Sequence, residues 1–472
     1  MSERKNRSRS RAKPATAASA AEQSDSALLR WLKEKRVTEV ECLVPDMTGN
    51  ARGKIVPTGK FKHDYGTRLA ESMFATTITG DYPDEYDSLV QTSESDMVVH
   101  ADADTARLVP WVSEPTAQII HDCFTHDGKP HPLPPRNVLR RVLAEYGKLG
   151  LKPVVAPEIE FYLVQKNIDP DLPLVPPVGR SGRAESAHNA YSIDAVNEYD
   201  PIIDLMYDYC EVMELDVETL IHETGTAQLE VNLVHADALS RADQVFLFKR
   251  AMREAALRHG IYATFLAKPM EHQPGSAMHI HQSLLDAKTG KNVFAGGKPG
   301  TESAIFRHYM GGLQKYTPAC MSLFAPNVNS YRRLVFGEVS PKNVQWGYDN
   351  RTCGFRVPRD TLENTRIENR FAGSDANPYL AMAYTLACGL LGIKEKLEPT
   401  PPAFDSVGED SSDYVLARSL VEALDALEVC EPLHELLGAR FVRAYIAVKR
   451  KEYETFFQVI SSWEREFLLL NV

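Results

Sequence analysis

Two short segments place ionisable side chains two residues apart, the spacing at which both would lie on one face of a strand. Glu158 and Glu160 form one such pair, and His279 and His281 form another. Alternate side chains of a strand point to the same face, so each pair would present its groups side by side. Adjacent carboxylates repel each other unless a cation lies between them. The first pair therefore indicates a metal site, whereas on an exposed strand it would be an ordinary solvated face.

Two further segments add acids to this set. Glu368 lies between Arg366 and Arg370, and Glu223 precedes Glu230 by seven residues. Taken singly, such patterns are common on protein surfaces, where ion pairs contribute little. Taken together, they interrupt apolar segments that should lie inside a large domain. A site rich in glutamate, with one or two histidines, favours Mg²⁺ or Mn²⁺ over zinc, because carboxylates prefer hard cations.

Arginine is concentrated in the same part of this acidic chain. The seven arginines between residues 332 and 370 are Arg332, Arg333, Arg351, Arg356, Arg359, Arg366 and Arg370. Forked guanidinium groups bind carboxylates and phosphates through paired hydrogen bonds. Carboxylate-held metal ions beside arginines are what phosphoryl transfer requires. The glycine-containing segment 49–55 has the wrong spacing for a Walker A motif, so a nucleotide would have to be held by another route.

Strand-like and helix-like segments alternate around these residues. Strands are predicted at 153–165, 226–234, 261–268, 276–284 and 365–371, and helices at 135–150, 201–214, 238–259, 301–317 and 378–397. The first of these helices has apolar residues on one face, begins near Pro135 and ends at Gly150. The chain after the proline-rich stretch 399–402 is predicted to be helical. This pattern indicates an α+β fold.

The chain divides into a tail and two domains. Residues 1–25 are rich in Ser, Ala, Arg and Lys, with almost nothing large to bury, and are predicted to be a disordered basic tail. A short helix around 28–32 and several short extended segments indicate a small α+β domain over residues 26–122. A linker with Pro, Gly and His follows, and residues 134–472 are predicted to form a large catalytic domain.

Composition and charge narrow the class of protein. Apolar residues make up 43% and charged residues 25% of the 472 residues, and the net charge is −11. The first thirteen residues carry six bases and one acid, so the remainder is near −16, which argues against nucleic acid as a partner. The seven cysteines form no CxxC pair, which excludes a thiolate zinc site and predicts a reducing, cytoplasmic location. The longest uncharged apolar run, 379–393, is too short to span a bilayer, so no membrane is expected.

Long motifs in a fixed order resemble the glutamine synthetase family, from about residue 38 to residue 395. They lie at 94–97, 110–111, 156–161, 222–230, 268–269, 275–283, 329–335, 350–351, 355–358 and 366–380. The resemblance implies an N-terminal β-grasp domain followed by a large catalytic domain of the glutamine synthetase type. It also implies a homo-oligomer, two stacked hexameric rings, in which neighbouring subunits share each active site.

The resemblance also implies roles for particular residues, motif by motif. Glu160, Glu223 and Glu230 would hold one divalent ion, and Glu158, His279 and Glu368 a second, with two or more Mg²⁺ or Mn²⁺ ions per site. The backbone at Gly275 would clamp L-glutamate together with Arg333 and Arg370, while Arg351 and Arg356 would meet the transferred phosphate. His281, Ser283 and Arg366 would line the pocket of the co-substrate ATP. In the implied reaction, the γ-carboxylate of glutamate attacks the γ-phosphorus of ATP, and an amine then attacks the acyl phosphate, from which water must be excluded.

Two positions depart from the pattern of those family members that use ammonia. Such members carry an aspartate where this chain has Ala75 and a glutamate where it has Val339, with Glu338 alongside. Loss of both acids enlarges the ammonium pocket and makes it more apolar, which favours an alkyl amine. Ala75 and Val339 are therefore predicted to set amine selectivity. Glu338 is a candidate for the base that deprotonates the amine, which is almost fully protonated near pH 7.

The segments 179–183 and 191–198 extend the resemblance, and it is greatest to the γ-glutamylpolyamine synthetases of bacterial polyamine catabolism. The hypothesis is an ATP-dependent ligase that joins the γ-carboxyl of L-glutamate to a primary amine, a polyamine such as putrescine, through γ-glutamyl phosphate. Three alternatives stay open. They are a glutamine synthetase that uses ammonia, a glutamate ligase for ethanolamine or another monoamine, and a non-catalytic structural member of the family.

Overall fold

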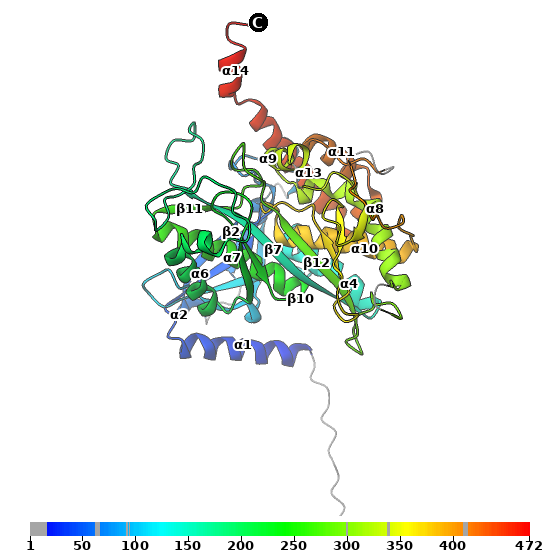
Figure 1. Ribbon diagram of the computed structural model, residues 1–472. Helices are drawn as coiled ribbons and strands as arrows, with labels where there is room; N and C mark the ends of the chain where they lie inside the picture. Colours follow the sequence, from blue (N-terminus) through cyan, green and yellow to red (C-terminus); the bar gives the residue numbers. More distant parts are fainter. Residues whose placement is uncertain are drawn as a thin grey trace, which may run out of the picture.

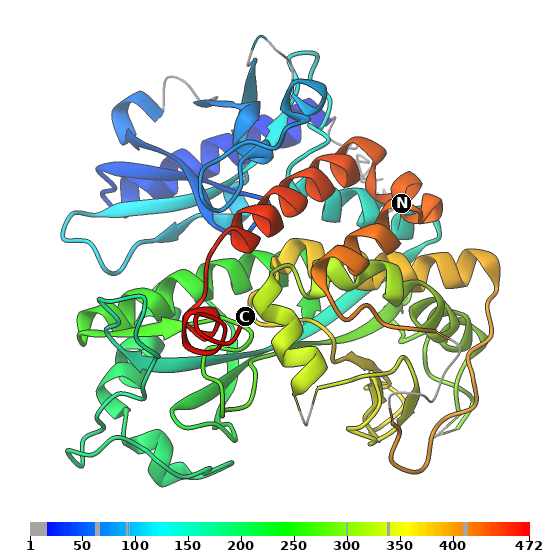
Figure 2. The ribbon, with the colours of Figure 1, turned by 90° about the horizontal axis from the view of Figure 1, so that it is seen from above.

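Two sheets organise the computed structural model, which describes residues 17–61, 67–90, 93, 95–298, 301–337, 340–408 and 414–472, with side chains from residue 26 onward. One sheet has six strands and the other nine. Figure 2 shows the smaller N-terminal sheet, in blue and cyan, beside the larger body that contains the rest of the chain. The predicted N-terminal domain, 26–122, ends two residues before the end of β6 at Phe124, and the predicted catalytic domain, 134–472, begins one residue before α4 starts at Pro135.

The small sheet is mixed, with strand order β2-β1-β6-β4-β3 and β5 paired with β6. Its strands are β1 (Glu39–Pro45), β2 (Ala51–Pro57), β3 (Thr67–Ala70), β4 (Asp96–Ala101), β5 (Arg107–Leu108) and β6 (Thr116–Phe124). β1 and β6 run parallel, and the other pairs are antiparallel. The short helical segments α2 (Thr58–Phe61), η1 (Glu71–Ala75), α3 (Tyr86–Leu89) and η2 (Ala103–Thr105) connect the strands.

Helix α1 (Ala17–Glu34) packs on this sheet, where Leu28 and Leu32 are buried with Cys42 and Ile119. Figure 1 shows it along the lower edge of the body. Because the helix begins at Ala17, the prediction that residues 1–25 form a disordered tail is wrong for residues 17–25. Residues 17–21 include four alanines, the residue with the highest helix propensity, and this propensity replaces the missing large apolar side chains. The remainder of the predicted tail, 1–16, lies outside the described residues.

The large sheet has the order β13-β14-β15-β12-β7-β9-β8, and β10 and β11 also pair with β7. The strands are β7 (Leu151–Gln165), β8 (Val217–His222), β9 (Gln228–Leu233), β10 (Ala236–Asp237), β11 (Ile261–Thr264), β12 (Met278–Asp286), β13 (Trp346–Tyr348), β14 (Phe355–Val357) and β15 (Ile367–Asn369). All pairs are antiparallel except β13 with β14. β7 is the centre of this sheet, and most of its side chains are buried.

Helices pack around the large sheet and enclose one continuous hydrophobic core. They are α4 (Pro135–Lys148), α5 (Ile193–Asn197), α6 (Asp200–Val212), α7 (Ala238–Arg258), α8 (Ala304–Phe324), α9 (Val328–Phe336), α10 (Pro378–Glu395), α11 (Leu420–Glu428), α12 (Glu431–Leu437), α13 (Ala439–Phe457) and α14 (Ser462–Phe467). α10 begins where the Asn377 side chain accepts hydrogen bonds from the backbone N–H groups of Tyr379 and Leu380. It is buried along almost its whole length, as the apolar run 379–393 predicted.

The predicted α+β class is confirmed. Among the helices of the described ranges, none has both the length and the apolar character needed to cross a membrane. The cytoplasmic location remains a prediction.

Candidate active site

Strand register brings the acids and histidines of the large sheet onto one face. β9 pairs Glu230 with Glu160 of β7, and β12 pairs His279 with Glu158. Alternation along each strand then places the members of each i, i+2 pair on the same face. The two-residue spacing therefore places both members of each pair on one face, as predicted. The pairing of β7 with β9 and β12 then brings the pairs of different strands together.

The first group of predicted metal ligands lies together. Glu160, Glu223 and Glu230 each offer an oxygen within 4.8 Å of the others. Burial, reinforced by the charge of Glu223, raises the pKa of Glu160 to about 8. Burial, with the charges of Glu158 and Glu160, raises the pKa of Glu230 to about 10. Three acids packed this closely fit a divalent cation, because an added positive charge relieves both their mutual repulsion and their desolvation.

The second predicted group also lies together. His279 Nδ1 is 3.4 Å from Glu158 Oε2 and 3.8 Å from Glu368 Oε1. Burial and the charge of Arg370 lower the pKa of His279 to about 4, which keeps the imidazole neutral and able to ligate a metal. His281, predicted for the nucleotide, is also close, with Nε2 2.8 Å from Glu158 Oε1. All donors in the two groups are oxygen or imidazole nitrogen, so the residues present fit Mg²⁺ or Mn²⁺.

A cavity of about 670 Å³ opens between these groups and the predicted arginines. Its lining includes the four arginines Arg333, Arg351, Arg356 and Arg370, and it also contains Gly275. A side chain at Gly275 would collide with the side chain of Arg333 and the carbonyl oxygen of Ala267, so only glycine fits at this wall. Carboxylate oxygens on one side and guanidinium groups on the other suit a ligand that carries both an anionic group and a metal-bound phosphate.

The arginines of this cavity are held in place by particular partners. Arg333 donates from Nη1 to the Phe371 carbonyl oxygen at 2.8 Å and from Nη2 to the Arg370 carbonyl oxygen at 3.0 Å. Arg356 and Arg370 both form ion pairs with Glu368. The charges of His281 and Arg370 lower the pKa of Glu368 to about 2, although burial alone would raise it.

Two donors of these arginines stay available to a ligand. Among the described residues, the buried Nε atoms of Arg356 and Arg370 have no hydrogen-bond partner. Buried donors of this kind are nearly always paired in a functioning protein, which indicates that an anion completes the site.

A second cavity, of about 450 Å³, adjoins the first. The three residues predicted for ATP, His281, Ser283 and Arg366, all line it, and Arg366 Nε lies 3.3 Å from His281 Nδ1. Glu158 and Asn232 line both cavities and so mark the place where they meet. A nucleotide in the second cavity could thus extend its phosphates toward the acidic groups of the first.

Of the three residues predicted for the amine, the structure describes one, and that residue is not at the cavity. Ala75 is completely buried in the core at the end of η1 and does not line either cavity. Glu338 and Val339 lie outside the described residues. The selectivity roles of Ala75 and Val339, and the role of Glu338 as a base, therefore stay predictions.

Sequence reasoning missed several residues of the site. Gln228 is buried and donates from Nε2 to Glu160 Oε2 at 3.2 Å and to the Gly275 carbonyl oxygen at 3.0 Å. Asn232 lies on the same strand, so the polar residues 228, 230 and 232 repeat with period two. That repeat is a signal the sequence already contained. Tyr191, at the cavity with a backbone φ of 62°, had no comparable signal.

The sequence matches the profile described as the glutamine synthetase catalytic domain over residues 132–468. It is 35% identical to a glutamine synthetase of Pyrococcus horikoshii, over 91% of this chain and 92% of that protein. It is 33% identical to γ-glutamylputrescine synthetase PuuA of Escherichia coli K12, over 94% of each. A solved structure described as apo GmaS without ligand superposes with a TM-score of 0.81 at 28% identity, over 94% of this chain and 99% of that one. The chain therefore belongs to the glutamine synthetase family and is an ATP-dependent ligase that forms C–N bonds.

Proposed function

We propose that this protein joins the γ-carboxyl group of L-glutamate to a primary amine, a polyamine such as putrescine, at the expense of ATP. The observation that carries the proposal is the cavity in which two groups of carboxylate and imidazole donors face four arginines and meet a nucleotide-sized pocket at Glu158. Similarity to the E. coli γ-glutamylputrescine synthetase supports the choice of amine.

The residues of the cavity divide the proposed reaction between them. Glu160, Glu223 and Glu230 would hold one divalent cation and Glu158, His279 and Glu368 another, and the cations supply positive charge that stabilises the phosphates of ATP. Arg333 and Arg370 would bind and orient L-glutamate beside Gly275. His281, Ser283 and Arg366 would hold the nucleotide.

The proposed chemistry has two steps. A γ-carboxylate oxygen of glutamate attacks the γ-phosphorus of ATP, and ADP leaves. Arg351 and Arg356, which line the same cavity, screen the charge that develops on the transferred phosphoryl group. The neutral amine nitrogen then attacks the γ-carbonyl carbon of the acyl phosphate, inorganic phosphate leaves, and a base takes the proton, for which Glu338 is the candidate.

Part of the cavity lining is apolar, which supports an alkyl amine. Tyr191, Ile221 and Val407 add apolar surface to a wall that is otherwise charged. Methylene groups gain free energy when they are buried against such surface, and ammonium has none to bury. Ammonia is nevertheless the second candidate substrate, because the chain is 35% identical to a glutamine synthetase and 33% identical to γ-glutamylputrescine synthetase PuuA.

The test is ADP release from ATP, L-glutamate and Mg²⁺ with ammonium, putrescine, cadaverine, spermidine and ethanolamine offered separately. We expect putrescine or another polyamine to give the highest kcat/KM. A higher value with ammonium would contradict the amine assignment, and one with ethanolamine would move it to a monoamine. No stimulation by any amine would favour a non-catalytic member of the family.

A single substitution tests the predicted selectivity position. Val339→Glu should raise kcat/KM for ammonium relative to putrescine, because it restores an acid that can bind a small cation. Ala75→Asp is a poorer probe by itself, because Ala75 is completely buried and an aspartate there would be desolvated within this chain. An unchanged ratio in Val339→Glu would show that this position does not select the amine.

A further inference from the structure

Asn232 stands in the same row of the large sheet as two of the proposed metal ligands. On β9 it lies directly opposite Glu158 of β7, and Glu158 in turn lies opposite His279 of β12. Glu230, two residues earlier on β9, points to the same face. The Asn232 side chain also lines both the catalytic cavity and the nucleotide pocket. Its amide is therefore positioned where the two cavities and the acidic groups meet.

The hydrogen bonds of Asn232 determine how its amide is oriented. The nitrogen Nδ2 donates to Glu158 Oε1 at 3.3 Å. A carboxylate oxygen accepts hydrogen bonds, so the amide nitrogen has to face Glu158 and the oxygen Oδ1 has to face away from it. Oδ1 is buried, and no hydrogen-bond partner for it exists among the described residues. A buried acceptor without a partner needs an explanation, and a bound ion or its water would provide one.

We propose that Asn232 is a further residue of the divalent-cation site and that its amide oxygen contributes to binding the ion held by Glu158 and His279. Uncharged amide oxygens are ordinary ligands of Mg²⁺-like and Ca²⁺-like cations, alone or through a bound water. This inference rests on the proposed function, since it requires that the acidic groups bind a divalent cation. A role limited to orienting Glu158 through Nδ2 is the competing explanation.

Two substitutions separate these explanations. Asn232→Ala removes both the oxygen and the donor to Glu158. Asn232→Asp keeps an oxygen and makes it anionic, but it replaces the donor with a second acceptor that repels Glu158. If the oxygen binds the cation, the aspartate variant should bind it at least as tightly as the wild type. If Asn232 only orients Glu158, the aspartate variant should bind it as weakly as the alanine variant or more weakly.

The experiment is a titration of metal-free, full-length protein with Mn²⁺, followed by the electron paramagnetic resonance signal of the free ion, without ATP or glutamate. We expect Asn232→Ala to weaken Mn²⁺ binding about tenfold and Asn232→Asp to bind no more weakly than the wild type. Asn167→Ala, on the exposed loop after β7 and outside both cavities, is the matched control and should bind like the wild type. The melting temperature of each metal-free variant shows whether it is folded.

Wild-type affinity in a folded Asn232→Ala variant would overturn the inference, and so would equal weakening in the aspartate and alanine variants. A wild-type protein that binds no Mn²⁺ would overturn it as well. The amine assay on the same preparations keeps the proposed function separate. Protein that binds Mn²⁺ as expected but turns over no amine would contradict the proposed function and leave the role of Asn232 intact.

Discussion

At the scale of a residue, Glu160 is a group whose burial disfavours its own charged form but suits the binding of a cation. Its carboxyl group is buried, accepts a hydrogen bond from the Ala277 N–H at 2.7 Å and lies beside Glu223 and Glu230. Desolvation and the neighbouring charge of Glu223 raise its pKa to about 8, so ionisation of this group in the metal-free protein is unfavourable. A cation bound by the three acids would reverse that preference. The residue is thus more useful to binding than to folding.

Glu160→Gln should separate these two contributions. The substitution keeps the shape of the side chain and an acceptor for the Ala277 N–H, but it removes the charge. We expect kcat/KM with glutamate, ATP and the best amine to fall at least about 100-fold, and the metal-free melting temperature to stay equal or rise. Steady-state kinetics and thermal melting check both outcomes. Glu41→Gln, at the ion pair between β1 and Arg250 of α7, is a control that should leave kcat/KM unchanged.

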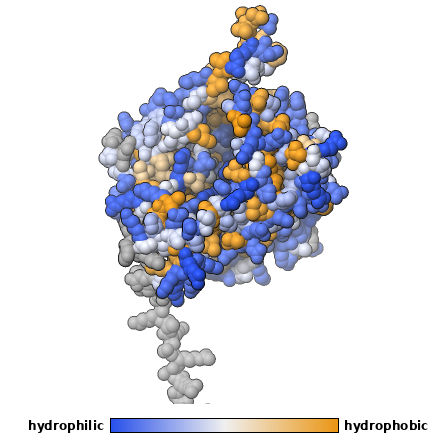
Figure 3. All heavy atoms as spheres, turned by 90° about the vertical axis from the view of Figure 1, so that its left-hand side faces the viewer, coloured by the Kyte–Doolittle hydropathy of each residue, from blue (hydrophilic) through white to orange (hydrophobic). Residues whose placement is uncertain are grey.

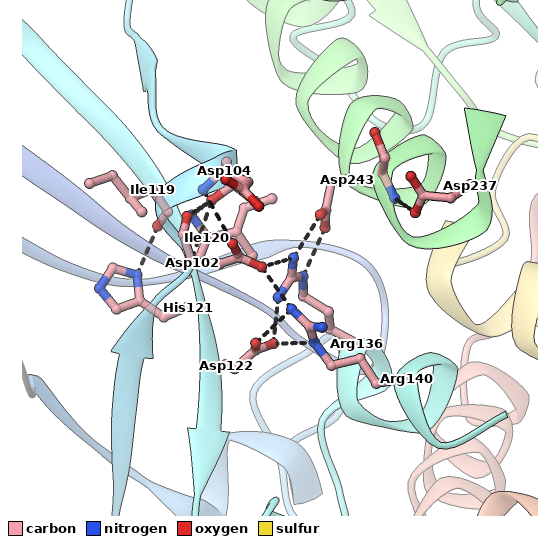
Figure 4. Close-up of polar contacts among 12 residues, drawn as sticks. Asp102, Asp104, Ile119, Ile120, His121, Asp122, Arg136, Arg140, Asp237 and Asp243 are labelled. Carbon is pink, nitrogen blue, oxygen red and sulfur yellow. Dashed lines mark hydrogen bonds and ion pairs between the residues drawn. The ribbon is translucent and has the colours of Figure 1, made fainter. Parts of the chain in front are cut away.

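At the scale of elements, Arg136 joins the small sheet to the catalytic body. Figure 4 shows its guanidinium group surrounded by the carboxylates of Asp102, Asp122 and Asp243. Asp102 follows β4 and Asp122 belongs to β6, whereas Arg136 is on α4 and Asp243 on α7. The guanidinium group is almost completely buried. It donates to Asp102 and Asp122 of the small-sheet domain and to Asp243 of the catalytic body. Arg136 is therefore the most buried of the arginines that join the small sheet to the body, beside Arg140 and Arg250.

Arg136→Ala should destabilise the protein by about 3–5 kcal/mol, because it leaves the buried carboxylate of Asp243 without a counter-charge. Arg140 contacts Asp102 and Asp122 as well, but it is 41% exposed, so Arg140→Ala should cost less than about 1 kcal/mol. Denaturant unfolding of both variants measures the difference. Equal losses in the two variants would show that burial at this junction does not set the strength of the ion pairs.

A buried histidine in the same sheet makes stability depend on pH. His121 on β6 is buried. Its Nδ1 lies 2.8 Å from the Ile119 carbonyl oxygen, and its Nε2 has no hydrogen-bond partner among the described residues. Burial lowers the pKa of His121 to about 4. Between pH 6.5 and 4 the unfolded chain therefore binds a proton that the folded protein does not. The folded state must lose stability as the pH falls through this window.

His121→Phe should remove this term. From pH 6.5 to pH 4 the wild type should lose about 3 kcal/mol more stability than the variant, since each pKa unit corresponds to about 1.4 kcal/mol. Denaturant unfolding at a series of pH values gives the two curves. His126→Phe removes an exposed histidine and should leave the wild-type curve unchanged. Parallel curves for the wild type and His121→Phe would contradict the burial argument.

At the scale of the whole molecule, the C-terminal segment after α13 is poorly covered by the rest of the described chain. α14 and the residues that follow it extend away from the body at the top of Figure 1, and Figure 3 shows hydrophobic residues on this extension. Trp463 is 60%, Leu470 91% and Val472 96% exposed. Exposed apolar side chains gathered on one segment are typical of a contact with another chain.

The two stacked hexameric rings predicted from the family resemblance can be tested directly. Twelve chains of 52.7 kDa would have a mass of about 630 kDa, which light scattering after size-exclusion chromatography measures. We expect this mass for the full chain and a smaller one for a chain that ends at Gln458, because burial of the exposed segment would stabilise the assembly. A monomer mass for the full chain would contradict the predicted assembly, and an unchanged mass after truncation would place the contacts elsewhere.

Local order along the chain was sufficient to predict much of the fold and of the candidate site. The two-residue spacing of Glu158 with Glu160, and of His279 with His281, placed each pair on one strand face before the strands were known. This worked because the direction of a side chain follows from the period of its own strand. The helix at α4 was likewise predicted from its apolar stripe, its proline and its following glycine.

Only the tertiary structure decided which of these residues meet. The register of β7 against β9 and β12 sets Glu158 beside Asn232 and His279, and helix packing brings Asp243 to Arg136. The tertiary structure also buries Ala75, which the sequence predicts to set amine selectivity. Contacts between residues that are distant in the chain depend on strand register and on the closing of one common core. Such long-range contacts cannot be predicted from the residue type at any one position. The direction of a side chain within its own strand or helix can be predicted, because it follows from the local sequence pattern.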